Sequence, residues 1–142
     1  MFLTRPDCLG AGLALRERLE AFGWPKVEAS EVGLMLVELA MNTVRHAGGG
    51  RAEISVESHR VIITIDDDGP GFPPWVLERW RRGEEVEVAF LPTAPGVAVP
   101  ARRGLGAGLD AARRLSHSLE LSNRPQGGAR AVATRLRHGT TR

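Results

Sequence analysis

The amino-acid sequence predicts a two-layer α/β (α+β) sandwich, in which helices pack on one face of an antiparallel or mixed sheet. Two amphipathic patterns of helical period come first, and two pairs of segments with strand-like alternation follow them. A long connection rich in glycine and proline separates the two strand pairs. The chain has 142 residues, 42% of them hydrophobic, so we expect a single domain over residues 1–142.

Two helices are expected before the first strand. Residues 7–22 place leucines near one face and charged side chains on the other, and Gly23 and Pro25 end the pattern. The second helix is expected from about Val27 to Ala47, where six apolar residues form a stripe. Three consecutive glycines, residues 48–50, stop it.

Four strands with alternating apolar and polar residues are expected at residues 52–57, 60–66, 118–122 and 129–136. The connection between the second and third strands contains a short helix at 74–82 and ends in a longer helix at 105–116. A connection of this length inside a small domain is usually functional. Residues 138–142 are expected to form a disordered tail.

Composition excludes the nucleotide sites that depend on lysine. Eighteen of the 19 basic side chains are arginine, and the single lysine, Lys26, lies in a Pro-Lys-Val run. A P-loop needs a Gly-Lys-Ser/Thr run, and the eukaryotic protein kinase core needs a strand lysine over the phosphates. Any nucleotide must therefore be held without lysine. The net charge is only +2, so we expect no direct binding of nucleic acid.

Cys8 is the single cysteine, so neither a disulfide framework nor a cysteine-based metal site is expected. No apolar run approaches the ~20 residues that a membrane span requires. The N-terminus lacks the basic flank and apolar core of a signal peptide. We therefore expect a cytoplasmic protein without membrane contact.

Three motifs follow one another in an order that suggests chemistry. Glu38, Asn42 and His46 lie at i, i+4 and i+8 on one stripe of the second helix. Taken alone, this spacing is typical of a solvent-facing helix side. However, Asp67-Asp68-Gly69-Pro70-Gly71 follows a strand, and Gly104-Leu105-Gly106-Ala107-Gly108 opens a helix. A glycine-rich turn at a helix start offers backbone N–H groups to phosphates without any lysine.

On these residues the chain resembles the GHKL ATPase superfamily, whose nucleotide-binding domain has the Bergerat fold. Residues 38–47 resemble its N box, and residues 67–71 and 104–109 resemble its two glycine boxes. Within the superfamily the chain is most similar to the bacterial anti-sigma factors and stressosome switch kinases, which are small serine kinases of partner-switching pathways. The resemblance covers about residues 5–137 and implies a histidine-kinase-like ATPase domain with an ATP lid at about 72–103.

The resemblance implies that the chain binds ATP and Mg²⁺. Glu38 would be the catalytic base, Asn42 would bind Mg²⁺ through its amide oxygen, and Asp67 would accept a hydrogen bond from the adenine amino group. His46 is expected to have a structural role. The other residues expected to bind the nucleotide are Gly69, Gly71, Arg103, Gly104, Leu105, Gly106, Ala107, Gly108 and Leu109.

Two features remain open. Relatives commonly open the last strand with Gly-Thr, whose hydroxyl helps to hold adenine, whereas here Gly128 is followed by Ala129. Either that hydrogen bond is missing, at a cost of about 0.5–1.5 kcal/mol, or water or Thr134 makes it. Arg102 and Arg103 stand close enough to the second glycine box for a guanidinium to reach a terminal phosphate, and a solvated end of the lid explains them equally well.

The leading hypothesis is a Mg²⁺- and ATP-dependent serine/threonine protein kinase that phosphorylates a STAS-type anti-sigma-factor antagonist. A sigma factor or a phosphatase is a further expected partner, and the chain is a candidate homodimer. The alternatives are an anti-sigma factor that acts mainly by sequestration, a detached ATP-binding domain of a histidine kinase, and a pseudokinase. A histidine kinase needs a phosphoacceptor hairpin upstream, and 37 residues before Glu38 are too few for one, so we expect the serine kinase.

Overall fold

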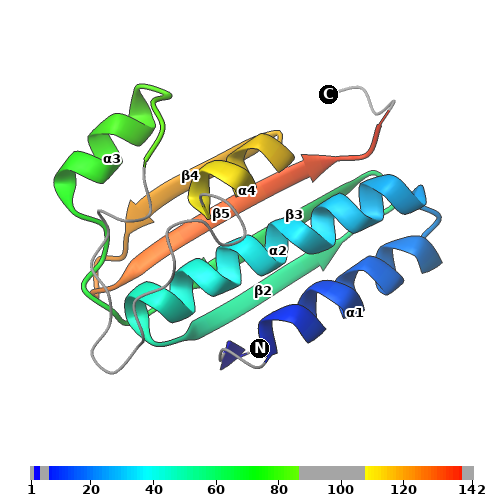
Figure 1. Ribbon diagram of the computed structural model, residues 1–142, viewed down its shortest axis with the longest axis horizontal. Helices are drawn as coiled ribbons and strands as arrows, with labels where there is room; N and C mark the ends of the chain where they lie inside the picture. Colours follow the sequence, from blue (N-terminus) through cyan, green and yellow to red (C-terminus); the bar gives the residue numbers. More distant parts are fainter. Residues whose placement is uncertain (1, 4–6, 87–107, 139–142) are drawn as a thin grey trace.

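The computed structural model describes residues 2–3, 7–86 and 108–138, which form two layers (Figure 1). The helices α1, α2 and α4 lie on one face of a twisted sheet, and α3 lies near the end of strand β4. The two-layer α/β fold expected from the sequence is confirmed. In chain order the elements are β1 (Phe2–Leu3), α1 (Asp7–Ala21), α2 (Lys26–Ala47), β2 (Gly50–Val56), β3 (Arg60–Asp66), α3 (Pro74–Arg81), α4 (Leu109–Leu115), β4 (Ser118–Asn123) and β5 (Ala129–Leu136).

The sheet has the strand order β1-β2-β3-β5-β4, and every pairing among the described strands is antiparallel. Its alternation is clearest in β3, where Val61, Ile63 and Ile65 are buried against the helices. The partners of Ile63 are Ile54 on β2 and Ala133 on β5. The face turned toward the helices is therefore apolar across the sheet, as the period of two in the sequence predicts.

Helix α2 is the centre of the fold, because it contacts α1, α4 and strands β2 and β3. Gly12 on α1 and Gly33 on α2 permit an unusually close crossing: a Cβ built at Gly12 would lie 2.4 Å from Cγ2 of Val37. The turn after α1 is anchored by Trp24, whose indole N–H donates to the Glu57 carbonyl at 3.1 Å. None of the helices in the described part of the chain is long and apolar enough to span a membrane.

Three details differ from the sequence prediction. Strand β1, which pairs with the start of β2, was not expected. Helix α4 begins at Leu109 and not at residue 105, because the backbone of Gly108 has a φ of 57° and cannot continue a helix. His138, the first residue of the expected tail, is among the described residues, and its backbone N–H donates to the buried Glu28 carboxylate at 2.6 Å. Residues 139–142 lie outside the described residues.

Candidate functional site

The solvent-facing interpretation of the polar stripe on α2 is wrong for its first two members, which are buried. Glu38 is 3% exposed and Asn42 is 6% exposed. Among the described residues, Oε2 of Glu38 and Oδ1 of Asn42 are buried oxygens without a hydrogen-bond partner. Leaving such a group unpaired costs about 1–3 kcal/mol, so a pair of unpaired oxygens one helical turn apart marks a place where a ligand is expected.

Burial raises the pKa of the Glu38 carboxyl above its ordinary value of 4.5. The positive charge of Arg45, a hydrogen bond from the backbone N–H of Gly108 and the charge of Arg114 offset part of this rise. The bond from Gly108 also shows that the last glycine of the second glycine-rich run reaches the carboxylate. The two motifs, 66 residues apart from Asn42 to Gly108, are thus brought together where α2 contacts α4.

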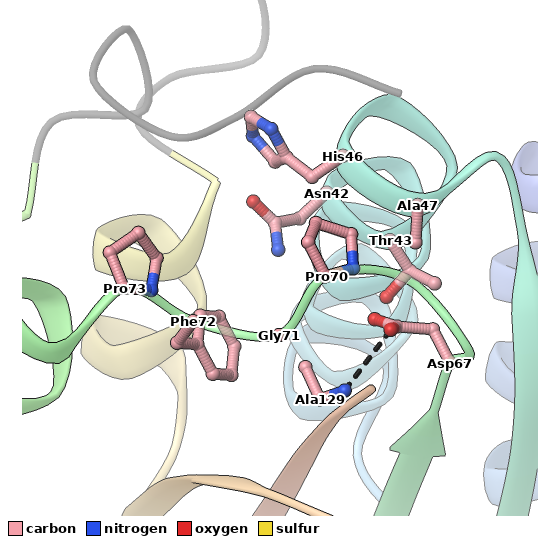
Figure 2. A pocket seen from close by; sticks show the side chains of 10 residues that line it. All are labelled: Asn42, Thr43, His46, Ala47, Asp67, Pro70, Gly71, Phe72, Pro73 and Ala129. Atoms are coloured by element: carbon pink, nitrogen blue, oxygen red, sulfur yellow. Dashed lines mark hydrogen bonds between the residues drawn. The ribbon is translucent and has the colours of Figure 1, made fainter. Parts of the chain in front are cut away.

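A pocket opens beside this stripe, with an empty volume of about 330 Å³ that includes its open mouth (Figure 2). Helix α2, the link from β3 to α3 and the first residue of β5 contribute its lining: Asn42, Thr43, His46, Ala47, Asp67, Pro70, Gly71, Phe72, Pro73 and Ala129. Most of these side chains are apolar or small, and the polar ones come from α2 and from the end of β3. Apolar walls with a few convergent polar groups are typical of a small-molecule site.

Asp67 is held in the pocket by two backbone donors. Its Oδ1 accepts hydrogen bonds from the N–H groups of Gly69 at 2.9 Å and Ala129 at 3.1 Å. Both bonds use the same oxygen, so the second carboxylate oxygen is not needed to hold the turn. The arrangement presents a carboxylate in a fixed orientation, which suits it to accept a hydrogen bond from an amino group of a ligand.

Two glycines allow the loops around Asp67 to close. Gly71 has a φ of 84° and Gly128 has a φ of 91°, and a Cβ at Gly128 would lie 1.9 Å from the Asp67 carbonyl oxygen. Asn123 of β4 holds the loop after Gly71, because its Oδ1 accepts from the Phe72 N–H at 2.7 Å and its Nδ2 donates to the Phe72 carbonyl at 3.0 Å. Sequence reasoning missed Asn123, since 51 residues separate it from Phe72.

The structure brings together a part of the predicted site. Glu38 and Asn42 share a stripe, Asp67, Gly69 and Gly71 lie in or beside the pocket, and His46 lines it. Gly108 and Leu109 follow at the start of α4. Of the lid expected at about 72–103, the structure describes residues 72–86, which include α3, and the rest lies outside the described residues. The remaining predicted residues also lie outside them: Arg102, Arg103, Gly104, Leu105, Gly106 and Ala107.

Thr134 cannot supply the hydroxyl missing at Ala129. The side chains of Ala129, Ala131 and Ala133 face the helices, and they are buried. Thr134 is displaced from Ala129 by an odd number of residues along β5, so its side chain projects from the opposite face of the sheet. The possibility that Thr134 replaces the missing hydroxyl is therefore wrong.

The oxygen atoms that the protein offers suit a Mg²⁺ ion whose other ligands are mainly phosphate oxygens and water. In the part of the chain that the structure describes, no three His, Cys, Asp or Glu side chains cluster as a metal site. Mg²⁺ commonly takes one or two protein oxygens and completes its shell with phosphates and water. Oδ1 of Asn42 fits that requirement, since it is a hard oxygen donor that has no partner among the residues described by the structure.

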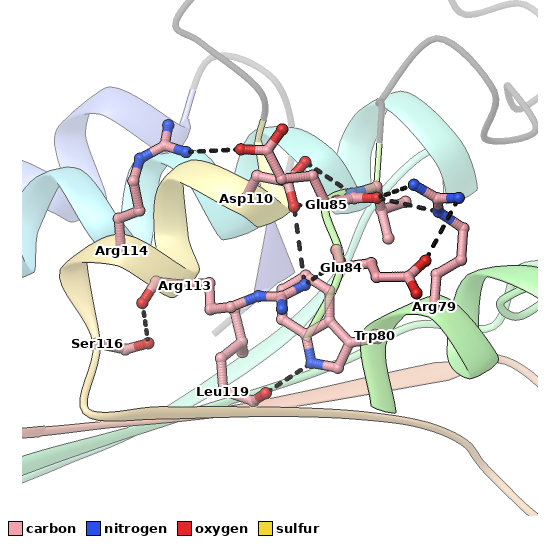
Figure 3. A network of polar contacts seen from close by, with 10 residues as sticks. Arg79, Trp80, Glu84, Glu85, Asp110, Arg113, Arg114, Ser116 and Leu119 are labelled. Carbon is pink, nitrogen blue, oxygen red and sulfur yellow. Dashed lines mark hydrogen bonds and ion pairs between the residues drawn. The ribbon is translucent and has the colours of Figure 1, made fainter. Parts of the chain in front are cut away.

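A second polar network ties α4 to the segment after α3 (Figure 3). Both carboxylate oxygens of Asp110 lie 3.0 Å from the Val86 N–H, and burial raises the pKa of this carboxyl. Arg113 stacks on Trp80, 3.3 Å from the ring centroid, and donates to the Glu84 carbonyl. The network fixes residues 84–86 against the helix that follows the second glycine-rich run.

Comparisons with known proteins agree with this geometry. The family described as histidine kinase-, DNA gyrase B- and HSP90-like ATPase matches residues 28–139. The sensor histidine kinase GtrS of Pseudomonas aeruginosa is 36% identical over 94 residues, which are 62% of this chain and 17% of that protein. The signal transduction histidine-protein kinase AfsQ2 of Streptomyces coelicolor is 26% identical over 109 residues, which are 73% of this chain and 19% of that protein. The chain thus spans about a fifth of the length of these curated relatives.

A solved structure has a similar fold. The catalytic domain of histidine kinase ThkA matches with a TM-score of 0.51 at 13% identity, over 96% of this chain and 96% of that chain. At this identity the likeness concerns the fold alone. It agrees with the two-layer arrangement of helices over an antiparallel sheet described above.

Proposed function

The chain belongs to the family of histidine kinase-, DNA gyrase B- and HSP90-like ATPases, and from that premise we propose that it is an ATP-binding catalytic domain that transfers the terminal phosphoryl group to a histidine on another polypeptide segment. The observation that carries the proposal is the Asp67 pocket, whose lining includes Asn42 with its buried, unpaired Oδ1 among the described residues. An apolar pocket with a carboxylate suits a nucleobase, and an unpaired oxygen suits a metal.

In this proposal different residues of the chain bind the base, the phosphates and the metal. The Asp67 carboxylate accepts a hydrogen bond from the adenine amino group, while Pro70 and Phe72 provide part of the apolar wall along the base. The backbone around Gly108 meets the phosphates at the start of α4. Oδ1 of Asn42 would help to hold Mg²⁺, which would supply positive charge near the transferred group.

The histidine acceptor is supported by the curated relatives, both of which are named histidine kinases. The matched regions are 17% and 19% of those proteins, so the acceptor segment proposed for this chain is sought on a separate polypeptide segment. An imidazole nitrogen attacks with its own lone pair, and this reaction needs no base to remove a hydroxyl proton. The domain then only has to hold ATP with its terminal phosphate accessible.

A second candidate is the serine/threonine kinase of a partner-switching pathway, and Glu38 favours it. A serine hydroxyl must lose its proton as its oxygen bonds to the terminal phosphorus and ADP leaves. A buried carboxylate with an unpaired oxygen and a raised pKa is suited to accept that proton. In this version the partner is a STAS-type antagonist, with a sigma factor or a phosphatase as a further partner and a homodimer as the assembly.

One experiment separates the two acceptors. The protein is incubated with Mg²⁺ and ATP labelled in its terminal phosphate, together with the helical hairpin protein or the STAS protein encoded nearest to its gene. Phosphohistidine is lost in acid and survives alkali, whereas phosphoserine survives acid and is lost in alkali. Acid-labile label on the hairpin supports the proposal, and acid-stable label on the STAS protein that disappears with Glu38→Gln supports the second candidate. ATP binding without transfer to either would contradict both.

A further inference from the structure

The pocket lacks a hydroxyl where the last strand begins. Ala129, the first residue of β5, lines the pocket with a methyl group, and its backbone N–H is already bonded to Asp67. Thr134 lies on the other face of the sheet. A hydroxyl that helps Asp67 to recognise a base must therefore come from a different element.

Thr43 on α2 occupies a suitable place. It is 7% exposed and lines the same pocket as Asp67 and Ala129. Figure 2 shows its hydroxyl oxygen on the side of the Asp67 carboxylate, while Asn42 and His46 project from the same helix away from Asp67. No role for Thr43 follows from the sequence, because it lies off the stripe formed by Glu38, Asn42 and His46.

The position of the Thr43 side chain is set by the strand beneath it. A Cβ built at Gly50, the first residue of β2, would lie 2.8 Å from Cγ2 of Thr43 and 2.5 Å from the Asp66 carbonyl oxygen. The methyl group of Thr43 thus occupies the space that glycine leaves open. Because a β-branched side chain in a helix has few rotamers, seating the methyl group there directs the hydroxyl away from Gly50 and toward the pocket.

The chemistry of the two groups matches one purine edge. Adenine presents an amino donor next to a ring nitrogen acceptor, whereas guanine presents a carbonyl acceptor next to a ring N–H donor. A carboxylate accepts from the amino group, and a hydroxyl can donate to the neighbouring ring nitrogen. We propose that Thr43 determines base specificity together with Asp67 by donating a hydrogen bond to the ring nitrogen beside the adenine amino group. This inference rests on the proposed binding of ATP in the pocket.

The test uses isosteric variants and calorimetric titration of the full chain with Mg²⁺-ATP. Thr43→Val removes the hydroxyl and keeps the shape, so the dissociation constant for ATP should rise about 2- to 12-fold, the range for one neutral hydrogen bond. Thr43→Ser should bind ATP nearly as well as the unchanged chain. Ala129→Thr, which places a hydroxyl at the start of β5, should restore affinity in the Thr43→Val background. Thr134→Val is the matched control on the opposite sheet face and should leave affinity unchanged.

A ligand analogue makes the test specific to the ring nitrogen. The analogue is ATP in which carbon replaces the ring nitrogen next to the carbon that bears the amino group. The unchanged chain should bind this analogue more weakly than it binds ATP. Thr43→Val should bind the analogue and ATP equally well. Equal affinity of the unchanged chain and Thr43→Val for ATP would overturn the inference. If the unchanged chain failed to bind ATP at all, the proposed function itself would be wrong, so the two failures are distinguishable.

Discussion

Replacing Asp67 by asparagine tests whether its carboxylate is the anchor for the base. The substitution keeps an oxygen that can accept the N–H groups of Gly69 and Ala129, which now lie 2.9 and 3.1 Å from Oδ1. It replaces the other oxygen by an NH₂ group, which is a donor. An amino group of the ligand would then meet a donor where it needs an acceptor, while the turn keeps its internal bonds.

The expected magnitude follows from these bonds. A hydrogen bond to a charged group contributes about 1.5–3 kcal/mol, so Asp67→Asn should weaken ATP binding by about 10- to 150-fold. Asp67→Ala should also destabilise the fold, because it leaves two partly buried N–H groups without an acceptor at about 1–3 kcal/mol each. Asparagine should cost less stability than alanine, because it still accepts both bonds.

Calorimetric titration with Mg²⁺-ATP and urea denaturation provide the two readings. Asp68→Asn is the matched control, since the carboxylate of Asp68 is exposed and accepts a hydrogen bond from Arg124 at 2.9 Å. This control should retain the affinity of the unchanged chain. If Asp67→Asn bound ATP as tightly as the unchanged chain, the carboxylate would not be the base anchor and the orientation assigned to the nucleotide would be wrong.

Three further predictions concern the buried groups and the helix crossing. Glu38→Gln should keep ATP binding, and it should abolish phosphoryl transfer only if the acceptor is a hydroxyl, as in the second candidate function. The pKa of Glu38 is raised in the folded state, so the carboxyl's contribution to stability is present below about pH 4 and is lost as the pH rises through the folded pKa. At pH 7 the glutamine variant should therefore be more stable toward urea than the unchanged chain. In acid this difference in stability should disappear. Gly12→Ala should destabilise the fold by about 1–3 kcal/mol, whereas Gly10→Ala, which has open space around it, should stabilise it by about 0.5–1 kcal/mol; equal denaturation midpoints would contradict the close crossing. Asp110→Ala should cost about 1–3 kcal/mol by leaving the Val86 N–H unpaired, and an unchanged midpoint would refute that contact.

The regular elements could be predicted because their periodicity is local. The alternation in residues 60–66 and the apolar stripe of the second helix each depend on a short stretch of chain, and both elements lie within one residue of the expected bounds. Strand β1 has only two residues, Phe2–Leu3, which is too short to show a period. Its place in the sheet depends on pairing with the start of β2, nearly fifty residues later.

The site was predicted only in part, because the sequence shows local spacing but not contacts between distant segments. The spacing of Glu38 and Asn42 places both on one stripe of a helix, but spacing cannot tell whether the stripe is buried. Burial depends on α4, which follows about seventy residues later. The contacts of Asn123 with Phe72 and of Asp110 with Val86 join distant segments, and neither pair has a signature in the sequence.

One of the alternatives left open for the missing hydroxyl, Thr134, is excluded for a local reason that the sequence already contained. Residues 129 and 134 differ by an odd number, so in a regular strand they face opposite sides of the sheet. The sequence could have excluded Thr134 once the strand was assigned. It could not have identified Thr43, because that residue reaches the pocket only after α2 packs on Gly50.

Titration of the purified chain with ATP, with and without Mg²⁺, tests the central claim most directly. The structure fixes the Asp67 carboxylate in the pocket and leaves Oδ1 of Asn42 unpaired among the described residues, and the proposal assigns the first to the base and the second to the metal. Saturable binding of one ATP per chain is therefore expected, strengthened by Mg²⁺, with the Mg²⁺ dependence much reduced in Asn42→Ala. Absence of binding under both conditions, from a chain that unfolds cooperatively in urea, would contradict the account.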